Sequence, residues 1–273
     1  MRTFHQVVKA FAILMAVLII AGIARLAMGL LGFLGDYQGG FSKGSKLIIT
    51  ERFERDYENI KHLDLESTIV DVTVKKGDSF KLDGYNIDDY FKTTVDGDRL
   101  IIKAIKKKFW FNNWKRQRRN LTIYVNDLET LELAAGASKT NVESIDVEKA
   151  RISMGAGSLV IDDSQFRTVR IDGGAGSIRV NNSILNDLVL NSGVGSVKLN
   201  AKLSGQAKIN NGIGSLRLDL HGTKEDYEIR VSKGIGSVTI DGDKIKDNDV
   251  FGSGYNKIVI DGGIGSTKIN FIR

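Results

Sequence analysis

The chain has 273 residues, with 39 Lys and Arg against 33 Asp and Glu, no cysteine and no proline. This length suffices for one large domain or two small ones with a buried core. The lack of cysteine excludes a disulfide scaffold, a thiolate metal site and a cysteine nucleophile. The lack of proline excludes a proline-rich linker.

The net charge of +6 comes from one short segment. Residues 99–126 contain nine Lys or Arg and no acid, so the rest of the chain is net acidic. A general nucleic-acid binder usually carries a broad basic surface. We therefore expect no nucleic-acid partner, and the basic segment is the first place to look for other partners.

The N-terminal region has the hydrophobicity of a membrane segment. Residues 10–24 are apolar and uncharged, and a second apolar run follows Arg25 up to residue 34. A helix over 10–34 would cross a hydrocarbon core of about 30 Å, whereas residues 10–24 alone would rise only about 22 Å. The sequence predicts a tail at 1–9, a single transmembrane signal-anchor helix at 10–34 and a glycine-rich linker at 35–45.

A cleaved signal peptide is the alternative, with Gly22-Ile23-Ala24 as its small-x-small site. Arg25 and the apolar residues beyond it fit such a site poorly. Arg2 and Lys9 precede the helix and favour an N-terminus inside the cell, although basic residues after the helix weaken this bias. We expect a single-pass protein of the cell membrane with an extracellular C-terminal body.

Residues 46–135 alternate apolar and polar side chains with period two. Leu63 and Leu65, and then Val72 and Val74, are examples. This alternation is typical of half-buried strands. We predict an antiparallel β region here, with residues 51–61 as a weak candidate for a helix.

A basic and aromatic loop interrupts this β region at residues 103–120, and it contains both tryptophans of the chain. Aromatic rings beside cations suit the headgroup region of an anionic membrane. The same composition suits a polyanionic wall polymer or, less well, RNA. The alternative without a ligand is a long hairpin with packed rings and solvated charges. The predicted anionic-surface site comprises Lys106, Lys107, Lys108, Phe109, Trp110, Phe111, Trp114, Lys115, Arg116, Arg118 and Arg119.

Six copies of Gly-[Ala/Val/Ile]-Gly-Ser follow, spaced by 19, 19, 19, 22 and 29 residues, and a degenerate copy at 136–138 precedes them. A fixed period of this kind indicates a solenoid. We predict a β-solenoid over 136–273, stacked in sequence order. The glycines predicted to form the corners of its coils are Gly155, Gly157, Gly174, Gly176, Gly193, Gly195, Gly212, Gly214, Gly234, Gly236, Gly263 and Gly265.

Within each repeat, the first and third positions after the serine are apolar, as in Val197 and Leu199. A second alternating stretch follows later in the unit, so each coil is predicted to hold two short strands. The residue between the two glycines is interpreted as inward-facing. The size of this side chain increases from Ala156 to Ile264 along the chain, which suggests a core that widens.

The repeats offer no ligand set for a metal or cofactor. In the calcium β-roll pattern a carboxylate follows the glycines, but here Ile178 and Thr267 occupy that place. The second residue after each serine is basic in four of six repeats: Arg179, Lys198, Arg217 and Lys268. We interpret this ladder as a solvated face that prevents edge pairing, with a polyanion site as the alternative.

The segments GAGSLVI, GAGSIRV, GVGSVKL, GIGSLRL and GIGSVTI, together with the apolar N-terminus, resemble a bacterial envelope family of unknown function known as "putative adhesin" proteins, which includes LiaG-like membrane proteins. The resemblance covers residues 46–273. It implies a β-solenoid without an assigned reaction, linked with envelope stress and with other membrane proteins of that response. It implies no catalytic residues and does not extend to the basic loop.

Together these features predict a membrane-anchored, surface-exposed, non-enzymatic β-solenoid that binds or senses anionic lipid, wall polymer or antimicrobial peptide. The alternative is a structural or adhesin-type scaffold that presents its rod to a protein partner. A carbohydrate-active enzyme would need Asp, Glu, Arg or His side chains that converge on one face. The outward positions here carry a Lys and Arg ladder instead, so we expect no enzyme and no cofactor.

Overall fold

The computed structural model describes residues 52–85, 87, 91–105, 119–232, 234–245 and 249–272. All of them belong to the unit from Thr50 to Arg273. The predicted membrane helix at 10–34 and the linker at 35–45 lie outside the described residues. Within the described part, no helix is both long enough and apolar enough to cross a membrane.

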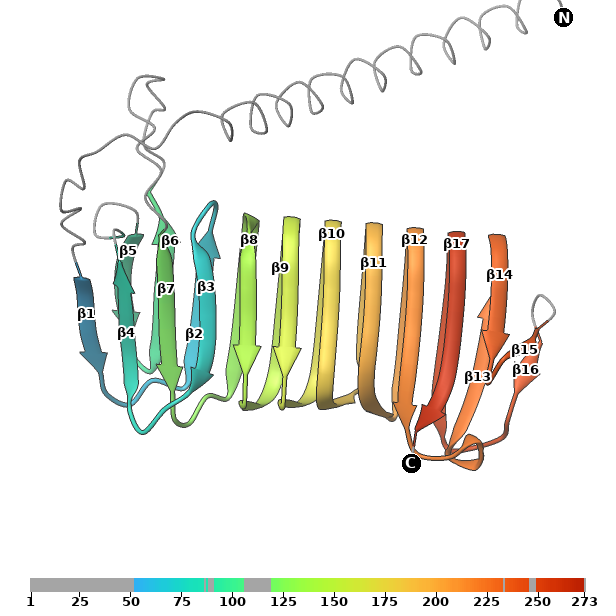
Figure 1. The fold of residues 1–273 in the computed structure, drawn as a ribbon. Coiled ribbons are helices and arrows are strands. Elements are labelled where there is room, and N and C mark those ends of the chain that lie inside the picture. The colour runs from blue at the N-terminus through green and yellow to red at the C-terminus, as the bar shows by residue number, and fades with distance from the viewer. Residues whose placement is uncertain are drawn as a thin grey trace, which may run out of the picture. The chain divides into compact units, whose positions relative to one another are not determined.

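The described residues form an all-β structure with a short 3-10 helix at Lys224–Asp226. Seventeen strands join in one sheet (Figure 1). Their bounds are β1 Arg52–Tyr57, β2 His62–Ser67, β3 Asp71–Lys76, β4 Phe80–Tyr85, β5 Phe91–Asp96, β6 Arg99–Ala104, β7 Asn120–Val125, β8 Thr130–Glu143, β9 Asp146–Asp162, β10 Gln165–Asn186, β11 Leu188–Ser204, β12 Gln206–His221, β13 Tyr227–Ser232, β14 Ile235–Ile240, β15 Asp243–Lys244, β16 Val250–Phe251 and β17 Asn256–Ile272.

The 19-residue period corresponds to parallel stacking of successive coils. Ile171 lies opposite Leu190 in the next coil, and Leu190 lies opposite Ile209 in the coil after that. Each strand from β8 to β11 therefore pairs in parallel with the next, as Figure 1 shows. The fold is β-solenoid-like, as the repeat predicted.

Each coil is one long bent strand rather than the two short strands predicted. Hydrogen bonding between coils continues through the glycine corner, where Gly176 pairs with Gly195 and then Gly195 with Gly214. Strands β9 to β12 and β17 therefore each bend over the corner without interruption. These corners form one edge, along the top of Figure 1, which we call the corner edge.

The core is made of the apolar positions that the repeat placed inside. Val197 and Leu199 are buried after the corner of β11, and Leu188 and Leu190 are buried before it. The matching pairs of the other coils are buried as well, including Thr267, which replaces an aliphatic residue in β17. Alternation with period two therefore identified the inner faces of both halves of each coil.

The second glycine of each motif has a backbone that a side chain would disturb. Gly195 has φ of 144°, and a Cβ there would overlap the carbonyl oxygen of Gly176 in the neighbouring coil. Gly157, Gly176, Gly214, Gly236 and Gly265 have φ between 139° and 150°. A side chain at these positions would collide with the backbone of the neighbouring coil, which is why the motif needs glycine.

The last two repeats do not stack in sequence order, contrary to the prediction. Ile213 of β12 pairs with Ile264 of β17, and Ile264 pairs in turn with Ile235 of β14. The C-terminal strand β17 is thus inserted between β12 and the strands β13 and β14. The short strands β15 and β16, in the longer spacing between the two repeats, pair antiparallel with β14 and β13.

The region before residue 136 is a mixture of parallel and antiparallel pairs, whereas a wholly antiparallel region was predicted. Strands β2 and β3 stack in parallel on the two halves of β8, and β6 and β7 stack in parallel on β2 and β3. Strands β1, β4 and β5 make the antiparallel pairs. Alternation with period two does not reveal strand direction, so the parallel pairs could not be predicted from it. The weak helix candidate at 51–61 is wrong, because residues 52–57 form strand β1.

Candidate binding surface

The described residues on either side of the basic and aromatic loop lie next to the corner of a coil. Residues 106–118, with almost all of the predicted anionic-surface site, lie outside the described residues, while Arg119 is described and half-buried. Lys103 at the start of the loop pairs with Glu66, and Asn120 at its end pairs with Asp71. Both partners flank the corner of the coil formed by β2 and β3, so the loop leaves and re-enters the body at the corner edge.

A single file of exposed apolar side chains runs along the same edge. The residue between the two glycines pairs with its equivalent in the next coil, as Val194 does with Ile213. Val194, Ile213 and Ile264 are 54%, 52% and 50% exposed, and Ile235 is 73% exposed. This file, the aliphatic ridge, comprises Ala137, Ala156, Ala175, Val194, Ile213, Ile264 and Ile235.

The predicted inward orientation of these residues is wrong. Val194 keeps period two with the buried Leu188 and Leu190 before the corner, but the backbone turns at Gly195 and the alternation breaks there. Val194 therefore lies on the outside, next to the exposed Ser196. The increase in size along the repeats enlarges an exposed apolar edge rather than the core.

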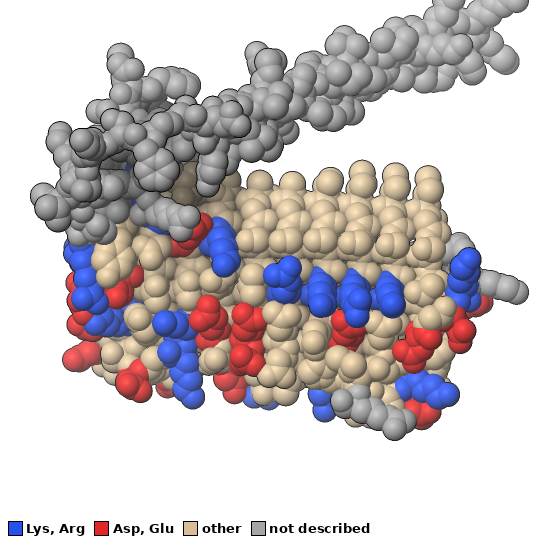
Figure 2. Space-filling view, in the orientation of Figure 1, with Lys and Arg blue, Asp and Glu red and all other residues tan. Residues whose placement is uncertain are grey.

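Four cations form a second file, the cation ladder, beside the ridge. Arg179 pairs with Lys198, Lys198 with Arg217, and Arg217 with Lys268, and all four are exposed. Figure 2 shows this row of basic side chains across neighbouring coils, with uncharged surface between it and the corner edge. Adjacent strands lie about 4.8 Å apart, so the ladder extends over about 14 Å.

The sequence suggested that the ladder protects a sheet edge, but the structure shows that it does not. Each of its strands has a hydrogen-bonded neighbour on both sides: β10 lies between β9 and β11, β11 between β10 and β12, β12 between β11 and β17, and β17 between β12 and β14. Interior strands need no charge to block pairing. The ladder is a solvent-exposed face, but edge protection does not explain it.

One ladder residue has a carboxylate partner on its own strand. Arg217 Nε donates to Asp219 Oδ2 at 2.8 Å, and Asn270 Nδ2 donates to Asp219 Oδ1 at 2.6 Å. Burial raises the pKa of Asp219, but these hydrogen bonds outweigh it and hold the pKa below its usual value. Asp219 is thus ionised and offsets part of the ladder charge. Among the described residues, no ion pair joins Arg179, Lys198 or Lys268 to a carboxylate.

The row between ridge and ladder is also free of acid. It contains the repeat serines and, in β8, Lys139, which pairs with Ser158. From β8 to β14, the three outward rows of the corner edge carry five Lys or Arg and no Asp or Glu. On the opposite face of the coils the charges are mixed. There Arg170 pairs with Asp172 at 2.7 Å, and Arg151 lies beside Glu132.

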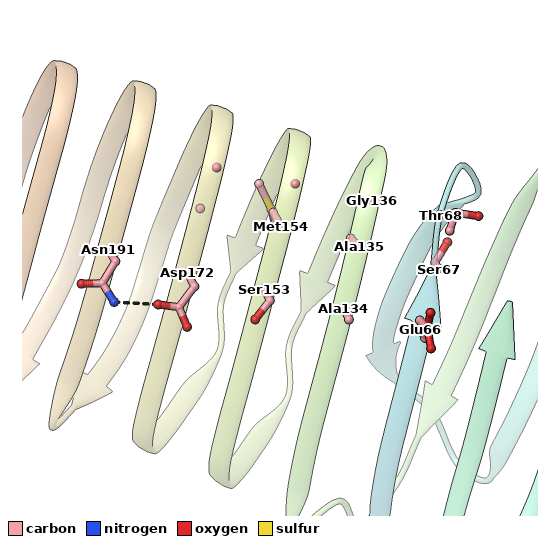
Figure 3. A pocket seen from close by; sticks show the side chains of 13 residues that line it. Glu66, Ser67, Thr68, Ala134, Ala135, Gly136, Ser153, Met154, Asp172 and Asn191 are labelled. Carbon is pink, nitrogen blue, oxygen red and sulfur yellow. Dashed lines mark hydrogen bonds between the residues drawn. The ribbon is translucent and has the colours of Figure 1, made fainter.

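A shallow groove of about 520 Å³ lies on that opposite face, across the N-terminal coils (Figure 3). Its floor is made of small residues such as Ala134, Ala135 and Gly136, with Glu66 and Asp172 among the lining residues. Asp172 accepts a hydrogen bond from Asn191 Nδ2 at 2.6 Å. Burial raises the pKa of Asp172, but hydrogen bonds from Asn191 and Arg170 lower the pKa by more, so that it lies below its usual value. The carboxylate is therefore charged and opposes anion binding in the groove.

The side chains Asp172, Asn191 and Asn210 form a polar ladder between coils. Asn210 Nδ2 donates to Asn191 Oδ1 at 2.6 Å, which continues the contact from Asn191 to Asp172. Asp and Asn side chains in this kind of position often satisfy turn amides. Their partners are instead the equivalent side chains of the next coil, because the parallel register places identical positions side by side.

The fold and the corner edge define an all-β repeat protein with glycine corners and an exposed apolar and cationic edge. The chain belongs to the Toastrack DUF4097 family, whose sequence profile matches residues 60–246. None of the curated proteins matches the sequence.

Several solved structures are similar to this chain. One is described as a putative adhesin from Bacteroides fragilis, at 17% identity and TM-score 0.42, over 84% of this chain and 100% of that chain. A putative cell adhesion protein from Clostridium sporogenes has 15% identity and TM-score 0.37, over 82% and 100%. A putative lipid binding protein from Parabacteroides distasonis has 16% identity and TM-score 0.36, over 82% and 97%.

Proposed function

We propose that this protein is a membrane-anchored, non-enzymatic binding protein whose body holds an anionic component of the cell envelope. The observation that carries the proposal is the cation ladder of Arg179, Lys198, Arg217 and Lys268. Two unit charges about 5 Å apart repel by about 0.8 kcal/mol in bulk water. Like charges opposite one another destabilise a sheet, and a bound row of phosphates relieves that repulsion.

The chain enters the described body at the corner edge, which supports an anchor on that side. Arg52 at the start of β1 pairs with Tyr85, and Tyr85 pairs with Asn120 beside the basic loop. The hydrophobic residues 10–34 precede this point in the sequence. In the proposal they anchor the protein in the cell membrane, and the body with its basic loop faces the outside. Sensing envelope stress is the role that the resemblance implies.

The non-enzymatic part of the proposal rests on the kind of residues that the corner edge presents. Its outward rows carry aliphatic, serine and basic side chains, with no carboxylate that could act as a general acid or base. Such a surface is suited to holding anions by charge. Binding is therefore the function that this edge supports best.

Removing ladder charge is expected to weaken anion binding. In the full-length chain held in zwitterionic nanodiscs, the pair of substitutions Lys198→Gln and Lys268→Gln should raise the Kd for inorganic polyphosphate about 30-fold, because each cation near an anionic surface contributes about 1 kcal/mol. The measurement is fluorescence anisotropy of labelled polyphosphate over a range of salt concentrations.

Lys208 and Lys257 provide the matched control, because both are exposed on the opposite face, Lys208 on β12 two residues before Asn210 and Lys257 on β17 opposite Gln206. The pair Lys208→Gln and Lys257→Gln should change the Kd by less than about threefold, since it removes the same charge away from the ladder. Equal losses for the two faces would show that net charge alone drives binding and would overturn the ladder as the site. Unchanged binding in both would leave the basic loop as the anion site.

A further inference from the structure

We infer that the corner edge docks on an anionic lipid bilayer, with the aliphatic ridge in the interfacial layer and the cation ladder against the headgroup phosphates. This inference rests on the proposed function and specifies the lipid surface as the anionic component. It assigns the ridge side chains Val194, Ile213, Ile264 and Ile235 to contact with lipid.

The first support is that ridge and ladder lie on one outer face at a spacing that fits a headgroup layer. The ladder residue lies four positions after the ridge residue, for example Lys198 after Val194, or about 13 Å along the strand. A Lys or Arg side chain of about 6 Å that snorkels toward the membrane brings its charge to about 7 Å from the ridge. A headgroup layer is about 5–8 Å thick.

The second support is that the edge matches an anionic surface in charge. The three outward rows from β8 to β14 carry five cations and no carboxylate. An exposed apolar strip flanked by cations is the pattern of surfaces that lie in the plane of a membrane interface. The opposite face, with Glu66, Glu132 and Asp172, lacks this complementarity.

A second copy of the chain fits the ridge less well. The ridge is a single file of side chains, and its four large, half-exposed members offer on the order of 200 Å² of apolar surface. A stable protein interface needs about 800 Å² from each partner. A lipid surface makes no such demand, because it adapts to the side chains that enter it.

The third support is the point where the chain joins the body. Arg52, where the described body begins, lies at the corner edge beside Tyr85 and Asn120. Residues 35–51 separate it from the hydrophobic segment 10–34. Seventeen residues span at most about 60 Å even when fully extended, so in the proposal an anchor at 10–34 limits how far this edge can lie from the bilayer.

The test uses the absence of cysteine from the chain. The full-length protein carries either Ile264→Cys or Val259→Cys, labelled with an environment-sensitive fluorophore, in nanodiscs with anionic or zwitterionic lipid. Both residues are exposed on β17, at 50% and 39%, but Val259 faces away from the corner edge, beside Lys208 and Arg230. Brominated lipid should quench the label at 264 several-fold more than the label at 259, and only in anionic nanodiscs.

A second variant measures the contribution of the ridge. Ile213→Ser, added to the Ile264→Cys chain, should lower the docked fraction about fivefold, which corresponds to about 1 kcal/mol.

Equal quenching at both positions, or none at either, would overturn docking by this edge. Quenching that is equal in anionic and zwitterionic nanodiscs would show that the ladder takes no part in docking. A label at 264 that changes with protein concentration but not with lipid would identify a second copy as the occupant. Polyphosphate binding is a separate measurement. If it persists while docking fails, the proposed function stands and the docking of this edge on lipid is wrong.

Discussion

Deletion of residues 256–273 is expected to destroy the cooperative folding of the repeat array rather than to shorten it by one coil. Strand β17 is the parallel partner of both β12 on one side and β13 and β14 on the other. Its removal takes Ile258, Ile260 and Ile269 out of the core and leaves the terminal coil without a parallel neighbour. Each lost isoleucine costs about 2–5 kcal/mol, so the total reaches the stability of a typical domain.

Paired proline substitutions test the same point in the full-length chain. Val259 of β17 lies opposite Arg230 of β13, and both side chains are exposed. Val259→Pro interrupts an interior strand and should lower the urea midpoint of the whole body, whereas Arg230→Pro affects only the terminal coil. If Arg230→Pro were the more harmful of the two, or if the truncated chain kept the midpoint of the full-length protein, insertion of β17 would be wrong.

Gly195→Ala is a point substitution expected to have a large effect on stability. The φ of 144° belongs to a region that L-residues rarely adopt, and the new Cβ would overlap the carbonyl oxygen of Gly176. The backbone strain alone costs about 1–3 kcal/mol, and the steric overlap adds to it, so we expect a loss of at least about 3 kcal/mol. Urea unfolding followed by circular dichroism measures it.

The neighbouring Ser196→Ala is the control, because Ser196 is exposed on the outer face. Its effect should stay within about 0.5 kcal/mol, as for most surface substitutions. A Gly195→Ala chain as stable as the Ser196→Ala chain would show that the corner has room for a side chain. The glycines of the repeat would then have another role.

The inner faces of the coils could be predicted from the sequence, because burial imposes alternation with period two. Period two could not place the ridge, because Val194 is in phase with the buried Leu190 before the corner and out of phase with the buried Val197 after it. The prediction failed because small and aliphatic side chains between glycines were assigned to the core by their hydrophobicity.

The order of the last two coils could not be predicted from the repeat. All repeats share the same motif, so Ser237 or Ser266 could pair equally well with Ser215. The choice depends on the segment between them, which forms β15 and β16 and pairs with the outer edges of β14 and β13. Strands β13 and β14, which carry β16 and β15, lie at the end of the stack only when β17 is inserted between them and β12.

The central claim, an envelope-facing body, is tested most directly by trypsin treatment of intact and lysed cells. The basic residues at 103–119 provide cleavage sites, and an antibody against the C-terminal repeats follows the body. We expect the full-length band to disappear on intact cells while a cytoplasmic control protein remains uncut. Protection of the body until lysis would place it inside the cell and contradict the account.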